Sequence, residues 1–148
     1  NAVRLFTIVR ADAGDTRFND WDGAATYAYD TSSKKVNETI KLVDKDLANF
    51  KVEAKSSVKE DAYDKMRQFD WLVARVTMDS SKTIPTAVTS YCASIRKDCE
   101  DICTAIDAAS NMTEMKALYT DTVVDGKVTE VARVNRWSDD SSVIDLKR

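Results

Sequence analysis

Apolar residues recur at alternating intervals of four and three positions through much of the chain, with charged residues between them. This spacing places the apolar side chains along one face of a helix and predicts helices that pack side by side. The chain also has only 3 Gly and 1 Pro in 148 residues, whereas a β-sandwich or barrel needs a turn every few residues. Both observations favour long helices. The first apolar stripe consists of Val36, Ile40, Val43, Leu47, Phe50 and Ala54.

The same spacing returns twice further along the chain. Ser56 and Ser57 are interpreted as a break before the second stripe, and Pro85 as part of the first turn of the helix that carries the third. Asn111, with Glu114 three residues later, has the character of a capping box that opens one more helix. The second stripe is Val58, Ala62, Met66, Phe69, Val73 and Val76, and the third is Val88, Cys92, Ile95, Cys99, Ile102, Ile106 and Ala109.

The segment before the first stripe is harder to assign. Residues 2–10 contain β-branched residues that suit a strand, but their apolar spacing also suits a short helix. After a turn around Gly14, we expect Asp15 or Thr16 to cap a helix. The side chains that this helix would bury are Phe18, Trp21, Ala25 and Ala28.

The segment after residue 120 also allows two assignments. Residues 124–127 carry the Asp-Gly signature of a two-residue β-hairpin, but they also suit a turn between helices, and we favour the helix. The tail after Trp137 is polar, and within it we expect Val143, Ile144 and Leu146 to dock against the rest of the chain.

Together these patterns predict an all-α fold, an up-down bundle of four to six helices with an extended N-terminal segment and a polar C-terminal tail. The length suits a single domain over residues 1–148. We divide it into an N-terminal segment (1–30), the bundle (31–137) and the tail (138–148).

The chain contains no histidine. This excludes the Ser-His-Asp and Cys-His arrangements, imidazole acid–base catalysis, and zinc or haem held by histidine. Carboxylates are abundant, but nothing places two of them in an apolar cleft, and the aspartates around the glycines lack the ligand spacing of a calcium loop. We therefore predict a non-enzymatic protein with no catalytic, cofactor-binding or metal-binding residues.

The thiols are Cys92, Cys99 and Cys103, of which Cys92 and Cys99 belong to the third stripe. On one straight helix Cys92 and Cys99 stand about 10 Å apart along the axis, which is too far for a disulfide. An intrachain bridge therefore requires the helix to break near Lys97 and Asp98. We favour core thiols, with an intermolecular bridge or one local bridge as the alternatives.

Charge and hydropathy restrict the partners. The net charge of −3, with basic residues interleaved among acidic ones, argues against nucleic acid, and no apolar run approaches the roughly 20 residues that span a bilayer. The first residue is Asn rather than Met, from which we expect export or organelle import. Among the aromatic residues, Trp21 and Trp137 are the candidate interface residues.

Several segments of the C-terminal half carry a family pattern. Leu72-Val73-Ala74-Arg75 precedes Asp79, and then come residues 101–109 (Asp-Ile-Cys-Thr-Ala-Ile-Asp-Ala-Ala), residues 113–119 (Thr-Glu-Met-Lys-Ala-Leu-Tyr), and Val128 with Val131. This pattern covers about half of the chain and resembles the three C-terminal helices of PsbQ-type extrinsic subunits of photosystem II. The chain departs from that family in its three cysteines, its polar tail and the lack of a proline-rich N-terminal arm.

The resemblance implies a four-helix bundle in the thylakoid lumen that binds the lumenal face of photosystem II. Such a subunit shields the oxygen-evolving cluster and helps to retain calcium and chloride without ligating metals. The sequence therefore predicts a non-catalytic protein that docks on a larger complex, with photosystem II as the most specific form. The alternative is a secreted, extracellular carrier or inhibitor that binds a small apolar ligand or a host protein, which requires a cavity lined by Phe50, Met66, Phe69 or Ile106.

Overall fold

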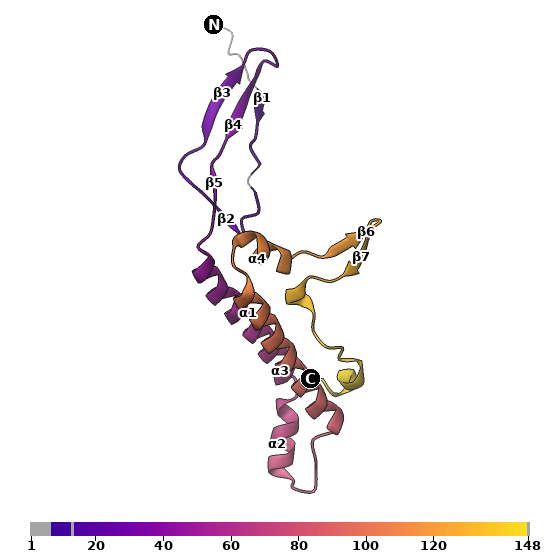
Figure 1. Ribbon diagram of the computed structural model, residues 1–148. Helices are drawn as coiled ribbons and strands as arrows, with labels where there is room; N and C mark the ends of the chain where they lie inside the picture. Colours follow the sequence, from indigo (N-terminus) through magenta and orange to yellow (C-terminus); the bar gives the residue numbers. More distant parts are fainter. Residues whose placement is uncertain (1–6, 13, 148) are drawn as a thin grey trace. The chain divides into compact units, whose positions relative to one another are not determined.

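The computed structural model describes residues 7–12 and 14–147, and the chain divides after Leu47 into two compact units. The N-terminal unit consists of strands, and the C-terminal unit consists mainly of helices (Figure 1). The all-α fold predicted above is wrong, because three sheets accompany the helices in the described residues and the chain is mixed α and β.

The N-terminal unit contains a three-stranded sheet and a two-stranded sheet. The three-stranded sheet has the order β1-β4-β3, with β1 parallel and β3 antiparallel to β4. The two-stranded sheet pairs β2 with β5 in antiparallel fashion. The strands are β1 (Thr7–Val9), β2 (Asn19–Trp21), β3 (Thr26–Asp30), β4 (Lys35–Thr39) and β5 (Leu42–Asp44).

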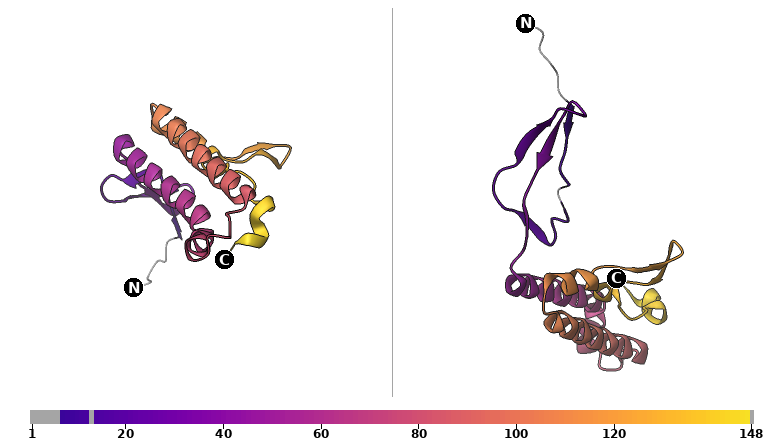
Figure 2. Two further views of the ribbon diagram at one scale, coloured as in Figure 1. Left: turned by 90° about the horizontal axis from the view of Figure 1, so that it is seen from below. Right: turned by 45° about the horizontal axis from the view of Figure 1, so that its top comes forward.

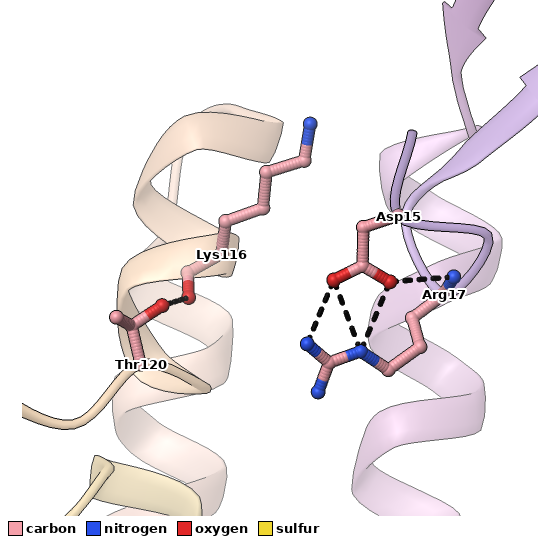
Figure 3. A network of polar contacts seen from close by, with 4 residues as sticks. All are labelled: Asp15, Arg17, Lys116 and Thr120. Carbon is pink, nitrogen blue, oxygen red and sulfur yellow. Dashed lines mark hydrogen bonds and ion pairs between the residues drawn. The ribbon is translucent and has the colours of Figure 1, made fainter. Parts of the chain in front are cut away.

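The helix expected after Gly14 is replaced by a turn and by β2 and β3. The Asp15 carboxylate accepts a hydrogen bond from the Arg17 backbone N–H at 3.0 Å and forms an ion pair with the guanidinium at 2.7 Å (Figure 3). This side chain thus stabilises a turn rather than a helix, and the Thr- and Tyr-rich sequence that follows has high strand propensity. Phe18 is buried as expected, but Trp21 and Ala28 are exposed.

The first apolar stripe is split between strands and a helix. Val36 lies in β4 and Val43 in β5, so that helix α1 (Leu47–Arg67) starts only at the fourth stripe residue. The break expected at Ser56 and Ser57 is absent, because α1 runs through both residues. The chain breaks instead before Asp70, where α2 (Asp70–Met78) begins, so the second stripe occupies two helices.

The core of the C-terminal unit lies between α1, α2 and α3 (Thr86–Ala108). Helices α1 and α3 run side by side (Figure 2). Lys55 of α1 forms a 2.7 Å ion pair with Asp107 near the C-terminal end of α3. Phe69 and Tyr91 pack edge to face, with ring centroids 5.8 Å apart. The helix predicted from the third stripe is confirmed. We call the buried residues Ala62, Phe69, Leu72, Val88, Tyr91, Ile95 and Val143 the core cluster.

The capping box at Asn111 is confirmed. Its side chain accepts a hydrogen bond from the Glu114 backbone N–H at 2.9 Å and opens α4 (Met112–Leu118). Past the end of α4, the Thr120 hydroxyl donates to the Lys116 carbonyl oxygen at 2.9 Å (Figure 3).

The helix that we favoured after residue 124 is wrong. Strands β6 (Thr122–Val124) and β7 (Lys127–Glu130) form a β-hairpin. Its two turn residues, Asp125 and Gly126, have φ values of +51° and +73°, the left-handed conformation of a type I′ turn.

Two short 3₁₀ helices follow the hairpin, η1 (Arg133–Asn135) before the C-terminal tail and η2 (Ser141–Leu146) within it. Val143 is buried in the core cluster and Leu146 packs against it, as expected, whereas Ile144 is exposed. The Ser138 backbone N–H donates to the Asp98 carboxylate of α3 at 2.6 Å, which fixes the start of the tail.

Candidate functional site

One face of the three-stranded sheet carries apolar and aromatic side chains. Val36 of β4 lies opposite Ile8 of β1 on one side and Tyr29 of β3 on the other, and Tyr27 lies opposite Glu38. Directly opposed residues point to the same face of a sheet. We call this set, Ile8, Tyr27, Tyr29, Val36 and Glu38, the tyrosine face.

The tyrosine face is largely exposed. The exposed fractions are 46% for Ile8, 57% for Tyr27 and 51% for Tyr29. Of the described residues in the N-terminal unit, Phe18 alone is buried. Sheets normally bury at least one face against another layer, so an apolar face with this much exposed surface indicates a binding surface.

Glu38 is the one charged residue of the tyrosine face, and neighbouring groups compensate its charge. The Glu38 carboxylate accepts hydrogen bonds from the Tyr27 hydroxyl at 2.8 Å and the Ala11 backbone N–H at 3.2 Å, and it forms an ion pair with Arg10 at 3.1 Å. The Tyr27 hydrogen bond is the main cause of a lowered pKa of Glu38, and the same bond raises the pKa of Tyr27. At neutral pH the carboxylate therefore stays ionised and paired with Arg10, so the face presents no isolated charge.

The two tryptophans predicted at an interface lie in different units. Trp21, in β2 opposite Leu42, is 58% exposed, and its place at an interface stays a prediction. Trp137 is half-buried, packs against the core cluster and has the Lys65 ammonium 5.5 Å from its ring centroid. The tyrosine face was not predicted, although Tyr27 and Tyr29 alternate around Ala28 with the two-residue period of a strand.

All three cysteines are free, half-buried thiols on α3. The helix does not break at Lys97 or Asp98, so the geometry that an intrachain bridge requires is absent. Cys92 and Cys99 pack against the core cluster, and burial raises the pKa of both thiols. Protonated, partly buried thiols of this kind are poor nucleophiles.

A small cavity lies where α1, α2 and α3 meet. Its volume is about 190 Å³, and its lining includes Met66, Phe69, Val73, Val88 and Cys92. Met66 and Phe69 are two of the four residues expected to line an apolar ligand site. Phe50 and Ile106 are not in its lining.

Within the part of the chain that the structure describes, no group of three or more carboxylates or thiols is arranged to hold a metal ion. Several aspartates instead stabilise turns. Asp79 accepts from the Ser81 backbone N–H at 3.0 Å, and Asp121 accepts from the Ala132 N–H at 2.6 Å across the base of the β6–β7 hairpin.

No helix among the described residues has the length and apolar character that a membrane span needs.

Comparisons of this chain with protein-family models, curated proteins and solved structures give no match. The segments that carry the resemblance to PsbQ-type subunits lie in α2, α3 and α4, but Val128 lies in β7 rather than in a final helix. The four-helix bundle implied by the resemblance is therefore not the fold of this chain, and the relationship itself stays a prediction.

Proposed function

We propose that this protein is a non-catalytic docking subunit whose N-terminal sheet attaches to a larger protein assembly through the tyrosine face. The observation that carries the proposal is the exposure of Ile8, Tyr27 and Tyr29 together on one face of a sheet. Tyrosine is enriched among the residues that dominate binding energy, because its ring is large and rigid and its hydroxyl forms hydrogen bonds at the rim.

The partner surface complementary to this face is flat and mainly apolar. Burial of apolar area contributes about 25 cal/mol per Å² before the costs of association are subtracted, so a broad contact is needed. Docking on photosystem II in the thylakoid lumen rests on the family resemblance alone, and it stays a prediction outside the proposal.

Hydroxyl-radical footprinting tests the proposal on the full chain. The oxidation rates of Tyr27 and Tyr29 are compared between the native assembly, isolated without denaturation, and the purified chain at low concentration. We expect both tyrosines to become several-fold less reactive in the assembly. Tyr63, which is 59% exposed on α1, is the internal control and should not change. Equal reactivity of Tyr27 and Tyr29 in the two samples would overturn the proposal.

A carrier of a small apolar ligand is the second candidate, and the cavity beside Met66 and Phe69 supports it. The cavity is smaller than the roughly 300–1,000 Å³ of ordinary ligand sites, so it ranks below docking. The test uses benzene, a probe that fits apolar cavities of this size. A carrier should gain thermal stability with benzene, and Val73→Trp at the exposed side of the cavity should abolish the gain. No gain in the wild type rules the carrier out.

A further inference from the structure

The outer edge of β3 suggests a second interface, independent of the tyrosine face. We propose that two copies of this chain pair through antiparallel β3 edges, about a two-fold axis at Ala28, to form one six-stranded sheet. The inference goes beyond the docking function, because it concerns the edge of the sheet rather than its face.

Strand β3 is an edge of the three-stranded sheet, since among the described strands it pairs only with β4 (Figure 1). An edge strand presents a row of backbone N–H and C=O groups that another strand can pair with. Proteins usually protect such an edge with lysine, proline, a bulge or a very short strand.

None of these protections is present in β3. Its five residues, Thr26–Asp30, include no lysine, arginine or proline, and its register with β4 is continuous. The other edge of the same sheet, β1, has 3 residues in the described part of the chain and is followed by the charged Arg10. The β6–β7 hairpin has both a register shift and a lysine at the start of β7. The protections thus occur elsewhere in the chain and are absent from β3.

The residues of β3 complement a second copy of themselves. With the axis at Ala28, each Tyr27 lies opposite Tyr29 of the second copy, and each Thr26 lies opposite Asp30. The tyrosine pairs fall on the same face, where aromatic cross-strand pairs stabilise a sheet. The two Ala28 side chains meet on the opposite face, where their small size allows a close approach.

The charges on β3 select the antiparallel arrangement. Asp30 is the only carboxylate of the strand. In the antiparallel dimer the two Asp30 residues are offset by four residues along the strands, and at about 3.4 Å per residue this separates them by about 14 Å. A parallel pairing in register would instead place the two Asp30 carboxylates side by side. An antiparallel two-fold pairing also closes after two copies, as an isologous interface does. The resulting sheet, in the order β1-β4-β3-β3-β4-β1, joins two tyrosine faces into one wider face.

Charged residues introduced at the axis test both the partner and the register. Ala28 is exposed, so Ala28→Lys and Ala28→Glu should leave the single chain folded. In each variant the axis brings two like charges directly opposite each other, and we expect dimer dissociation constants to rise by more than tenfold. An equimolar mixture places lysine opposite glutamate and should dimerise again. Sedimentation is measured from about 1 μM to about 1 mM, because an interface of this small size is expected to be weak.

A disulfide trap gives a second, independent measurement. Opposed residues in antiparallel strands have Cα atoms about 4.5–5.5 Å apart, which suits a disulfide. Under mild oxidation we expect Ala28→Cys to form an interchain bridge between the two new thiols, identified by peptide mapping. The matched control is Thr26→Cys, on the same face of the same strand, whose two thiols would lie too far apart to bridge.

Each outcome decides the proposal. A wild-type chain that stays monomeric over the whole concentration range overturns it, and so does a dimer that both charge variants leave intact. Equal cross-linking of the two cysteine variants overturns the register. If the chain is monomeric but Tyr27 and Tyr29 are still protected in the native assembly, the docking function stands and only the dimer fails.

Discussion

Ile95 has no exposed surface and sits in the core cluster on the α3 side. We predict that Ile95→Ala lowers the free energy of unfolding by about 2–5 kcal/mol, because the substitution removes buried apolar atoms and leaves a cavity in their place. Val73→Ala is the matched control, since Val73 is 55% exposed on the neighbouring α2, and it should change stability by at most about 0.5 kcal/mol. Urea unfolding monitored by helical circular dichroism measures both. Equal effects of the two substitutions would contradict the placement of the core.

A second prediction at this scale concerns the pH dependence of Glu38. Its pKa in the folded chain lies below the ordinary value of about 4.3, chiefly because the Tyr27 hydroxyl donates to the ionised form. The stabilisation from this group is therefore complete above the ordinary value and is lost as the pH falls through the folded pKa.

We expect Tyr27→Phe to raise the pKa of Glu38 toward its ordinary value, because the substitution removes the main donor. A titration of the Glu38 carboxyl followed by NMR measures the shift directly. Tyr63→Phe, in the other unit, serves as the control and should leave the midpoint unchanged. A Glu38 midpoint that is the same in wild type and Tyr27→Phe would exclude the hydrogen bond as the cause.

At the scale of elements, local signals predicted the helices α3 and α4, whereas the equally local Asp-Gly signal of the β6–β7 hairpin was set aside in favour of a helix. Helix α3 follows from its stripe and α4 from its cap, since each pattern lies within one segment. The stripe that starts at Val36 failed because Val36 pairs with Ile8, 28 residues earlier, and no local periodicity reports such a pairing. The tyrosine face was missed for the same reason, because it exists only once β1, β3 and β4 are aligned.

The β6–β7 hairpin gives a prediction that isolates backbone conformation. Gly126 has a φ of +73°, and a Cβ placed there would meet no atom within 4 Å. Gly126→Ala should therefore cost about 1–2 kcal/mol through left-handed backbone strain alone. Asp125→Asn is the control, since asparagine tolerates the φ of +51° at that position and should be nearly neutral. Chemical denaturation compares the two, and hydrogen exchange in β6 and β7 localises the effect. A neutral Gly126→Ala would argue against the type I′ turn.

At the scale of the whole molecule, each of the two units is stabilised by different interactions. The core cluster and the buried residues Ile102, Ile106 and Met115 all lie in the C-terminal unit. The described residues of the N-terminal unit bury only Phe18, so that its sheets depend largely on backbone ladders and on exposed polar contacts. Segments with few buried apolar contacts open at lower free energy than a packed core.

Native-state hydrogen exchange on the full chain should therefore show two levels of protection. At low concentration, we expect the amides of β3 and β4 to exchange at least ~100-fold faster than those in the centre of α3, because opening the sheets exposes little apolar surface. Raising the concentration should slow exchange in β3 if its edge pairs with a second copy, and should leave α3 unchanged, since no α3 backbone group takes part in that interface. Uniform protection across the two units at low concentration would contradict this division, because it would mean that the sheets and the helices open together as one cooperative structure.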